Sequence, residues 1–164
     1  MVKLSSLAGA AQVIVIETVE EKRELAQELG ATLFINPMKE DAKQVIADAG
    51  IENVDKVMEC VGNKITVESA LDIAGKCATV VLFGLTDEKQ SIDFYPYQAF
   101  RKELTIKASY VNPNTMDHAI KIMAGGKFPT DKFISEEISL EEVEQELKTQ
   151  TYAKYGKVMV KIED

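Results

Sequence analysis

The sequence has few of the residues from which metal sites and disulfide frameworks are built. Its 164 residues include two cysteines, one histidine and no tryptophan. A structural zinc site usually takes four Cys or His ligands, so we expect this chain to supply no metal ligands and to hold no zinc. We interpret Cys60 and Cys77 as small buried apolar groups and His118 as a polar helix residue. Two lone thiols and the lack of a convincing secretory signal predict a cytoplasmic protein.

Long apolar runs and an excess of basic charge are also missing. No run approaches the roughly 18 apolar residues of a membrane-spanning helix. The 19 basic and 27 acidic side chains give a net charge of −8, which repels phosphodiester backbones and anionic lipids. We therefore expect neither a nucleic-acid partner nor a membrane partner. With four prolines, nine glycines and 46% hydrophobic residues, the composition indicates one globular domain over residues 1–164.

The motifs of nucleotide binding and catalysis are absent as well. None of the nine glycines falls in a G-x-G-x-x-G turn or a G-x-x-x-x-G-K-[ST] phosphate loop. An H-E-x-x-H motif and a G-x-S-x-G motif are missing too. The sequence therefore predicts no complete set of catalytic residues.

What the sequence does contain is an alternation of short β-branched runs and amphipathic stretches. This pattern is typical of parallel strands joined by crossover helices, and it predicts an α/β fold, a doubly wound parallel sheet with helices on both faces. The expected strands are 13–16, 33–35, 54–60, 78–83, an edge strand at 91–94, 104–110 and 157–162. The expected helices are the end of one in 1–9, then 19–29, 39–49, 66–74, a turn at 97–100, 115–124 and 140–149, with a Pro129-containing loop between the last two.

Ligands of open parallel sheets bind at the carboxyl ends of the strands, where loops and helix N-termini meet. Glu17 directly follows the first buried strand. Its carboxylate suits the two hydroxyls of an adenosine ribose and repels a 2′-phosphate. An acidic residue that merely complements the dipole of the next helix explains Glu17 equally well.

Three further strand ends carry candidate residues. They are the segments Cys60-Val61-Gly62-Asn63, Phe83-Gly84-Leu85 and Ser109-Tyr110-Val111-Asn112. The glycine in the first two would let a ligand approach the backbone closely. Each glycine is also explained as a simple turn, so it is their number at one sheet edge that favours a binding site.

These residues resemble a known family. Val13-Ile14-Val15-Ile16-Glu17, Glu59-Cys60-Val61-Gly62-Asn63 and Val80-Val81-Leu82-Phe83-Gly84 look like the cofactor-binding domain of zinc-type medium-chain alcohol and polyol dehydrogenases, with sorbitol and threonine dehydrogenases among the relatives. The resemblance continues through Ser109-Tyr110-Val111-Asn112-Pro113 and covers essentially the whole chain. It implies a Rossmann fold.

The resemblance also implies roles for the candidate residues. Glu17 would hold the adenosine ribose, which favours NAD over NADP, and Lys22 or Arg23 would lie beside that ribose. Cys60, Val61 and Gly62 would line the adenosine and nicotinamide-ribose side of the cleft. Phe83, Gly84 and Leu85, together with Ser109, Tyr110 and Val111, would approach the nicotinamide.

The sequence also departs from the family. The N-terminal domain that supplies the catalytic zinc ligands has no counterpart here, nor have the first Rossmann strand and its glycine-rich turn. We therefore expect a truncated and incomplete Rossmann sheet. Its strands at 13–16 and 54–60 would face an empty slot of about 4.8 Å on each side. We expect these strands to close together, or the chain to self-associate through a sheet edge.

Two functions remain after this comparison. The first is a truncated NAD-binding domain of a zinc-type dehydrogenase, inactive alone and with weak or vestigial NAD affinity. The second is a non-catalytic subunit or structural module, which forms homo-oligomers or pairs with an intact dehydrogenase subunit.

Overall fold

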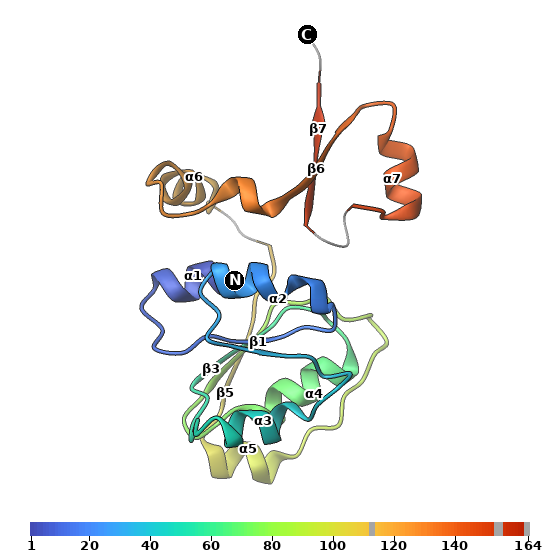
Figure 1. The fold of residues 1–164 in the computed structure, drawn as a ribbon. Helices are drawn as coiled ribbons and strands as arrows, with labels where there is room; N and C mark the ends of the chain where they lie inside the picture. The colour runs from blue at the N-terminus through green and yellow to red at the C-terminus, as the bar shows by residue number, and fades with distance from the viewer. Residues whose placement is uncertain (112–113, 153–155, 163–164) are drawn as a thin grey trace. The chain divides into compact units, whose positions relative to one another are not determined.

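The computed structural model describes residues 1–111, 114–152 and 156–162, which form two compact units. One unit comprises Met1–Phe34 and Asn114–Asp164, and the other comprises Ile35–Pro113. Strands and helices alternate along most of the chain (Figure 1). None of the helices in the described ranges is long and apolar enough to cross a bilayer.

The unit formed by residues 35–113 is built around a three-stranded parallel sheet in the order β3-β4-β5. Its elements are α3 (Ala42–Asp48), β3 (Lys56–Glu59), α4 (Lys64–Ile73), β4 (Thr79–Leu82), α5 (Pro96–Lys102) and β5 (Thr105–Ala108). In register, Glu59 of β3 lies opposite Leu82 of β4, and Leu82 lies opposite Ala108 of β5. The carboxyl ends of the three strands therefore lie at one edge, as the sequence predicts.

The core of this unit lies between the sheet and helix α4, which packs against β3 and β4 (Figure 1). Val57 and Val80 from the strands are buried against Ala70, Ala74 and Ala78. The small side chains of Ala70 and Ala74 let the backbone of α4 lie close to the β-branched strand residues.

Local hydrogen bonds fix both ends of α4. Asn63 begins the helix, its side chain accepting from the backbone N–H of Thr66 at 2.9 Å while the Thr66 side chain accepts from the Asn63 N–H. This is a reciprocal capping arrangement. At the other end the Lys102 ammonium donates to the carbonyls of Leu71 and Asp72. Lys102 thereby attaches the last turn of α5 to the last turn of α4.

The other unit contains two small sheets. Its elements are α1 (Val2–Leu7), β1 (Ile14–Ile16), a 3₁₀ turn (Glu20–Lys22), α2 (Arg23–Glu28), β2 (Leu33–Ile35), α6 (Met116–Ala124), a second 3₁₀ turn (Thr130–Phe133), β6 (Ile134–Ser139), α7 (Val143–Thr149) and β7 (Lys157–Lys161). Strand β1 pairs with β2. Strands β6 and β7 pair in parallel, with an irregularity between Ile134 and Glu136.

Several expectations from the sequence are confirmed. The α/β class and the parallel pairing of the main sheet are as predicted. The predicted helix at 115–124 corresponds to α6 and carries His118, and the predicted tail strand corresponds to β7.

Other expectations are wrong. Residues 91–94 form no strand, because the backbone N–H of Asp93 donates to the Glu68 carboxylate instead of to a neighbouring strand. The predicted loop around Pro129 is shorter than expected, because a 3₁₀ turn occupies Thr130–Phe133 and β6 begins at Ile134. Cys60 and Cys77 are exposed and not buried.

The predicted closure of strand 13–16 onto strand 54–60 is not found either. Within the described ranges, β1 belongs to a sheet with β2, whereas β3 belongs to the sheet with β4 and β5.

Candidate functional site

Glu17 follows β1 directly and is held by its own neighbours. Its Oε2 lies 3.0 Å from the Lys22 ammonium, and its Oε1 accepts from the backbone N–H of Val19 at 3.0 Å. The Thr18 hydroxyl donates to the same Oε1 at 3.4 Å. An ionised carboxylate has about four acceptor sites, so three donors leave it able to accept from a ligand hydroxyl.

The ionisation of Glu17 is favoured by these contacts. Burial alone would raise the pKa of this carboxyl, but the hydrogen bond from the Val19 N–H and the bond and charge of Lys22 outweigh burial and lower the pKa below its usual range. The side chain of Glu17 keeps 27% of its exposure. Glu17 is therefore an ionised and accessible acceptor.

Lys22 and Arg23, both predicted beside the adenosine ribose, have different environments. Lys22 forms the ion pair with Glu17. Arg23 pairs with Glu20, donates to the Phe34 carbonyl at 3.1 Å and stacks over the Phe34 ring, with Cζ 4.4 Å from the ring centroid. Of the two, Lys22 is the cation that shares a site with Glu17, and Arg23 fastens α2 to β2.

The predicted segments after β3 and β4 are brought together by the sheet. The backbone carbonyl of Glu59 accepts from the N–H groups of both Phe83 and Gly84 at 2.9 Å. Cys60–Gly62 and Phe83–Leu85 therefore form neighbouring loops at one sheet edge, as their positions in the sequence predict.

Two glycines allow these loops to touch. Gly62 has a φ of +83°, a conformation that favours glycine. A Cβ at Gly62 would collide with the backbone of Leu85, and a Cβ at Gly84 would lie 2.7 Å from the carbonyl carbon of Val61 and 2.8 Å from Glu59 Oε2. Both glycines are thus required by the close approach of the loops.

The structure gives fewer contacts for the predicted segment after β5. The Ser109 N–H donates to the Leu82 carbonyl, which places Ser109 beside the end of β4. Tyr110 and Val111 are exposed. Asn112, which the sequence groups with them, lies outside the described residues.

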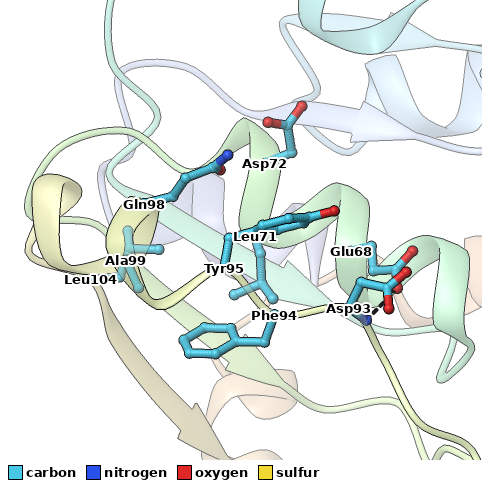
Figure 2. A pocket seen from close by; sticks show the side chains of 9 residues that line it. All are labelled: Glu68, Leu71, Asp72, Asp93, Phe94, Tyr95, Gln98, Ala99 and Leu104. Atoms are coloured by element: carbon cyan, nitrogen blue, oxygen red, sulfur yellow. Dashed lines mark hydrogen bonds between the residues drawn. The ribbon is translucent and has the colours of Figure 1, made fainter.

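A pocket of about 220 Å³ lies elsewhere in this unit, between α4 and the segment leading into α5. Figure 2 shows the carboxylates of Glu68 and Asp93 side by side at one end of it, with Phe94 and Tyr95 nearby. Lys64 lies 3.1 Å from Asp93 and 3.4 Å from Glu68, so these charges are partly neutralised. The predicted cofactor-binding residues do not line this pocket.

The donor groups for a metal centre do not come together. Among the residues that the structure describes, no three His, Cys, Asp or Glu side chains converge in a way that could hold a metal ion. The described residues therefore do not fit a zinc site.

Glu59 is a buried residue that the sequence prediction did not select. It is 4% exposed, and its Oε1 accepts hydrogen bonds at 2.8 Å from Val61 N, Gly62 N and the Thr66 hydroxyl. Its Oε2 is buried and has no hydrogen-bond partner. The glutamate stands two residues after Val57, on the core-facing side of β3. This was a detectable signal, because acidic residues are rarely buried without a partner.

Comparison with known proteins gives a consistent result. The family model for zinc-binding dehydrogenases matches residues 1–125. An L-threonine 3-dehydrogenase from Caldanaerobacter subterraneus is 33% identical over 107 residues, or 65% of this chain and 30% of that protein. An erythritol/L-threitol dehydrogenase from Mycolicibacterium smegmatis is 27% identical over 88% of this chain and 41% of its own length.

A solved structure is similar over almost the whole chain. It is a candidate zinc-binding dehydrogenase from Sinorhizobium meliloti bound to NADP, 33% identical, with a TM-score of 0.91 over 97% of this chain and 47% of that one. Such agreement shows that the fold is of the Rossmann dehydrogenase type. The chain spans less than half the length of each of these three relatives.

The contact between the loops predicts the effect of a methyl group at Gly84. We expect Gly84→Ala to lower the free energy of unfolding by about 1–3 kcal/mol, because the added Cβ meets backbone atoms that cannot move aside. Gly125→Ala is the control, since a Cβ there has its nearest contacts at 3.4 Å. Urea unfolding of both variants measures the difference, and equal losses would contradict the packing described.

The Glu17–Lys22 pair predicts a change in acid titration. A carboxyl whose pKa is lower in the folded than in the unfolded state stabilises the fold at pH values above its unfolded-state pKa. This stabilisation is lost as the pH falls through its folded-state pKa. We expect Lys22→Met to raise the pKa of Glu17, because one hydrogen bond and one positive charge are removed. Carboxyl ¹³C NMR titration measures it, with Lys76→Met as control. An unchanged Glu17 midpoint in Lys22→Met would show that Lys22 has no influence.

Proposed function

Because this chain belongs to the zinc-binding dehydrogenase family, we propose that it binds NAD as the nucleotide-binding part of an oxidoreductase that acts on alcohols or polyols. When bound, a nicotinamide cofactor supplies the hydride acceptor of such a reaction. The residues described here would bind and orient it. No step through zinc is assigned to this chain.

The observation that carries the proposal is the carboxylate at the end of β1. Glu17 is ionised, accessible and already oriented by the Val19 N–H, so it is suited to accept from a hydroxyl of an adenosine ribose. The twelve predicted residues stay as proposed: Glu17 with Lys22 or Arg23 for the adenosine ribose, Cys60, Val61 and Gly62 for the adenosine and nicotinamide-ribose side, and Phe83, Gly84, Leu85, Ser109, Tyr110 and Val111 for the nicotinamide.

Glu17 also favours NAD over NADP. A 2′-phosphate placed on this ribose would bring a second negative group against the carboxylate, and Lys22 compensates only part of that repulsion. The similar Sinorhizobium meliloti structure is bound to NADP, so the titration below compares both cofactors.

The affinity is expected to be low. The sequence has no G-x-G-x-x-G turn, so the pyrophosphate lacks its usual backbone cradle, and we expect a dissociation constant no better than about 1 mM, or roughly −4 kcal/mol.

Titration with NAD and NADP tests the cofactor proposal. We expect NAD to shift the amide resonances of residues 16–19 in ¹⁵N–¹H NMR spectra, and NADP to bind more weakly. Glu17→Gln keeps the shape but removes the charge, and we expect it to weaken NAD about tenfold and to narrow the difference from NADP. Glu21→Gln, with the same chemical change, is the control. Equal NAD binding by wild type and Glu17→Gln would reject this site.

We also propose that the chain self-associates through the edge of β5. Strand β5 is last in its sheet and all four of its residues are exposed, including Ile106. The N–H groups of Thr105 and Ser109 point to β4, so those of Ile106 and Ala108 point to the free side. Such an edge can pair with the same edge of a second copy about a two-fold axis.

Proline at position 108 tests this edge. We expect Ala108→Pro to shift the protein toward the monomer, because it deletes an outward N–H and leaves the bonds to β4 intact. Ala108→Ser, which keeps the N–H, is the control. Light scattering over a concentration series gives the mass of each variant. A dimer that survives in Ala108→Pro, or a wild type that is monomeric throughout, would overturn the proposal.

A further inference from the structure

We propose that Glu59 is the positioning residue of the nucleotide site, holding the Cys60–Asn63 loop in the shape that receives the nicotinamide side of the dinucleotide. This inference rests on the proposed function. It assigns a task to a buried carboxylate that the predicted ligand contacts do not use.

The first support is the number and direction of the bonds to Glu59. One oxygen, Oε1, collects two successive backbone N–H groups of the loop and the hydroxyl of Thr66 in the first turn of α4. The main chain of the same residue accepts from Phe83 and Gly84 of the next loop. Glu59 is thus bonded to both loops and to the start of the helix between β3 and β4.

The second support is what these bonds do to the loop. The N–H groups of Val61 and Gly62 turn inward to the carboxylate, which leaves the side chain of Val61 outside, 64% exposed. The carboxylate is the acceptor of both N–H groups, and one of these two bonds is made at the left-handed turn of Gly62. The exposed face of the loop therefore depends on a side chain beneath it.

The third support is the unpartnered oxygen. Glu59 Oε2 is buried beside Gly84, without a hydrogen bond. A buried acceptor without a donor is unfavourable, and a hydrophobic residue of this size would avoid that cost. The arrangement is explained if Glu59 is needed for the loop conformation and not for the stability of the core.

Hydrogen exchange tests the positioning directly and needs no nucleotide. We expect Glu59→Ala to speed exchange at the Val61 and Gly62 amides by about tenfold or more, while the β4 amides of Val80 and Val81 keep their wild-type rates. Glu59→Gln retains an oxygen acceptor, so we expect it to keep most of the protection. It also provides a test if Glu59→Ala fails to fold. Glu68→Gln, in which a carboxylate that accepts the Asp93 N–H is neutralised, is the matched control.

Nucleotide binding supplies the functional readout. NAD contains nicotinamide, a second ribose and a second phosphate that AMP lacks, so the ratio of their affinities reports the nicotinamide mononucleotide half of the dinucleotide. We expect Glu59→Ala to lower the NAD-to-AMP affinity ratio about tenfold, whereas general destabilisation would weaken both ligands together. Glu59→Gln should recover most of the ratio.

The outcomes separate the two proposals. If the wild type binds neither NAD nor AMP, the proposed function is overturned, and so is the nucleotide part of this inference. The exchange rates then still decide whether Glu59 holds the loop. Wild type that prefers NAD, with the same preference in Glu59→Ala, leaves the proposed function standing and overturns the positioning role. Unchanged exchange at Val61 and Gly62 in Glu59→Ala overturns it as well.

Discussion

The parallel pairing of β3 with β4 is the constraint from which the arrangement of the residue 35–113 unit follows. In-register pairing places Glu59 opposite Leu82, so the chain leaves both strands at the same level. The two loops then meet at backbone distance, and Gly62 and Gly84 are the residues that permit this contact. Burial of Val57 and Val80 against the alanines of α4 and of residue 78 holds the pairing in place. The same strand register therefore determines both the packing of the core and the contact between the candidate loops.

The sequence predicted the elements that a local residue pattern identifies, and it missed those that depend on a distant partner. The continuous apolar runs at 13–16 and 78–83 predicted strands β1 and β4. Burial is less complete than such runs indicate, since only Val13, Ala78 and Val80 among these residues are buried. Strand β6 was missed for the opposite reason. Its sequence, Ile134-Ser135-Glu136-Glu137-Ile138-Ser139, has two charged residues in succession and no period of two, and its pairing with β7 depends on partners 22 or 23 residues later.

The candidate site shows the same division. Strand ends and glycines are visible in sequence, so the loops after β3 and β4 were predicted with the correct neighbours. The partners of individual side chains were not visible. Arg23 contacts Glu20 and Phe34, and the role proposed for Glu59 depends on N–H groups whose direction the sequence does not specify. Cys60 was expected to be buried because thiols usually are, but it lies past the end of the strand and is exposed.

The ion pair of Glu17 and Lys22 has a consequence for how this site would respond to salt. The carboxylate carries its own counter-ion before any ligand arrives, at 3.0 Å. Binding of a neutral ribose beside this ion pair displaces no mobile ion. The affinity for the ribose would therefore depend little on ionic strength. A phosphorylated ribose must instead compete for the ammonium within a chain of net charge −8, and its binding would rise with added electrolyte as the repulsion is screened.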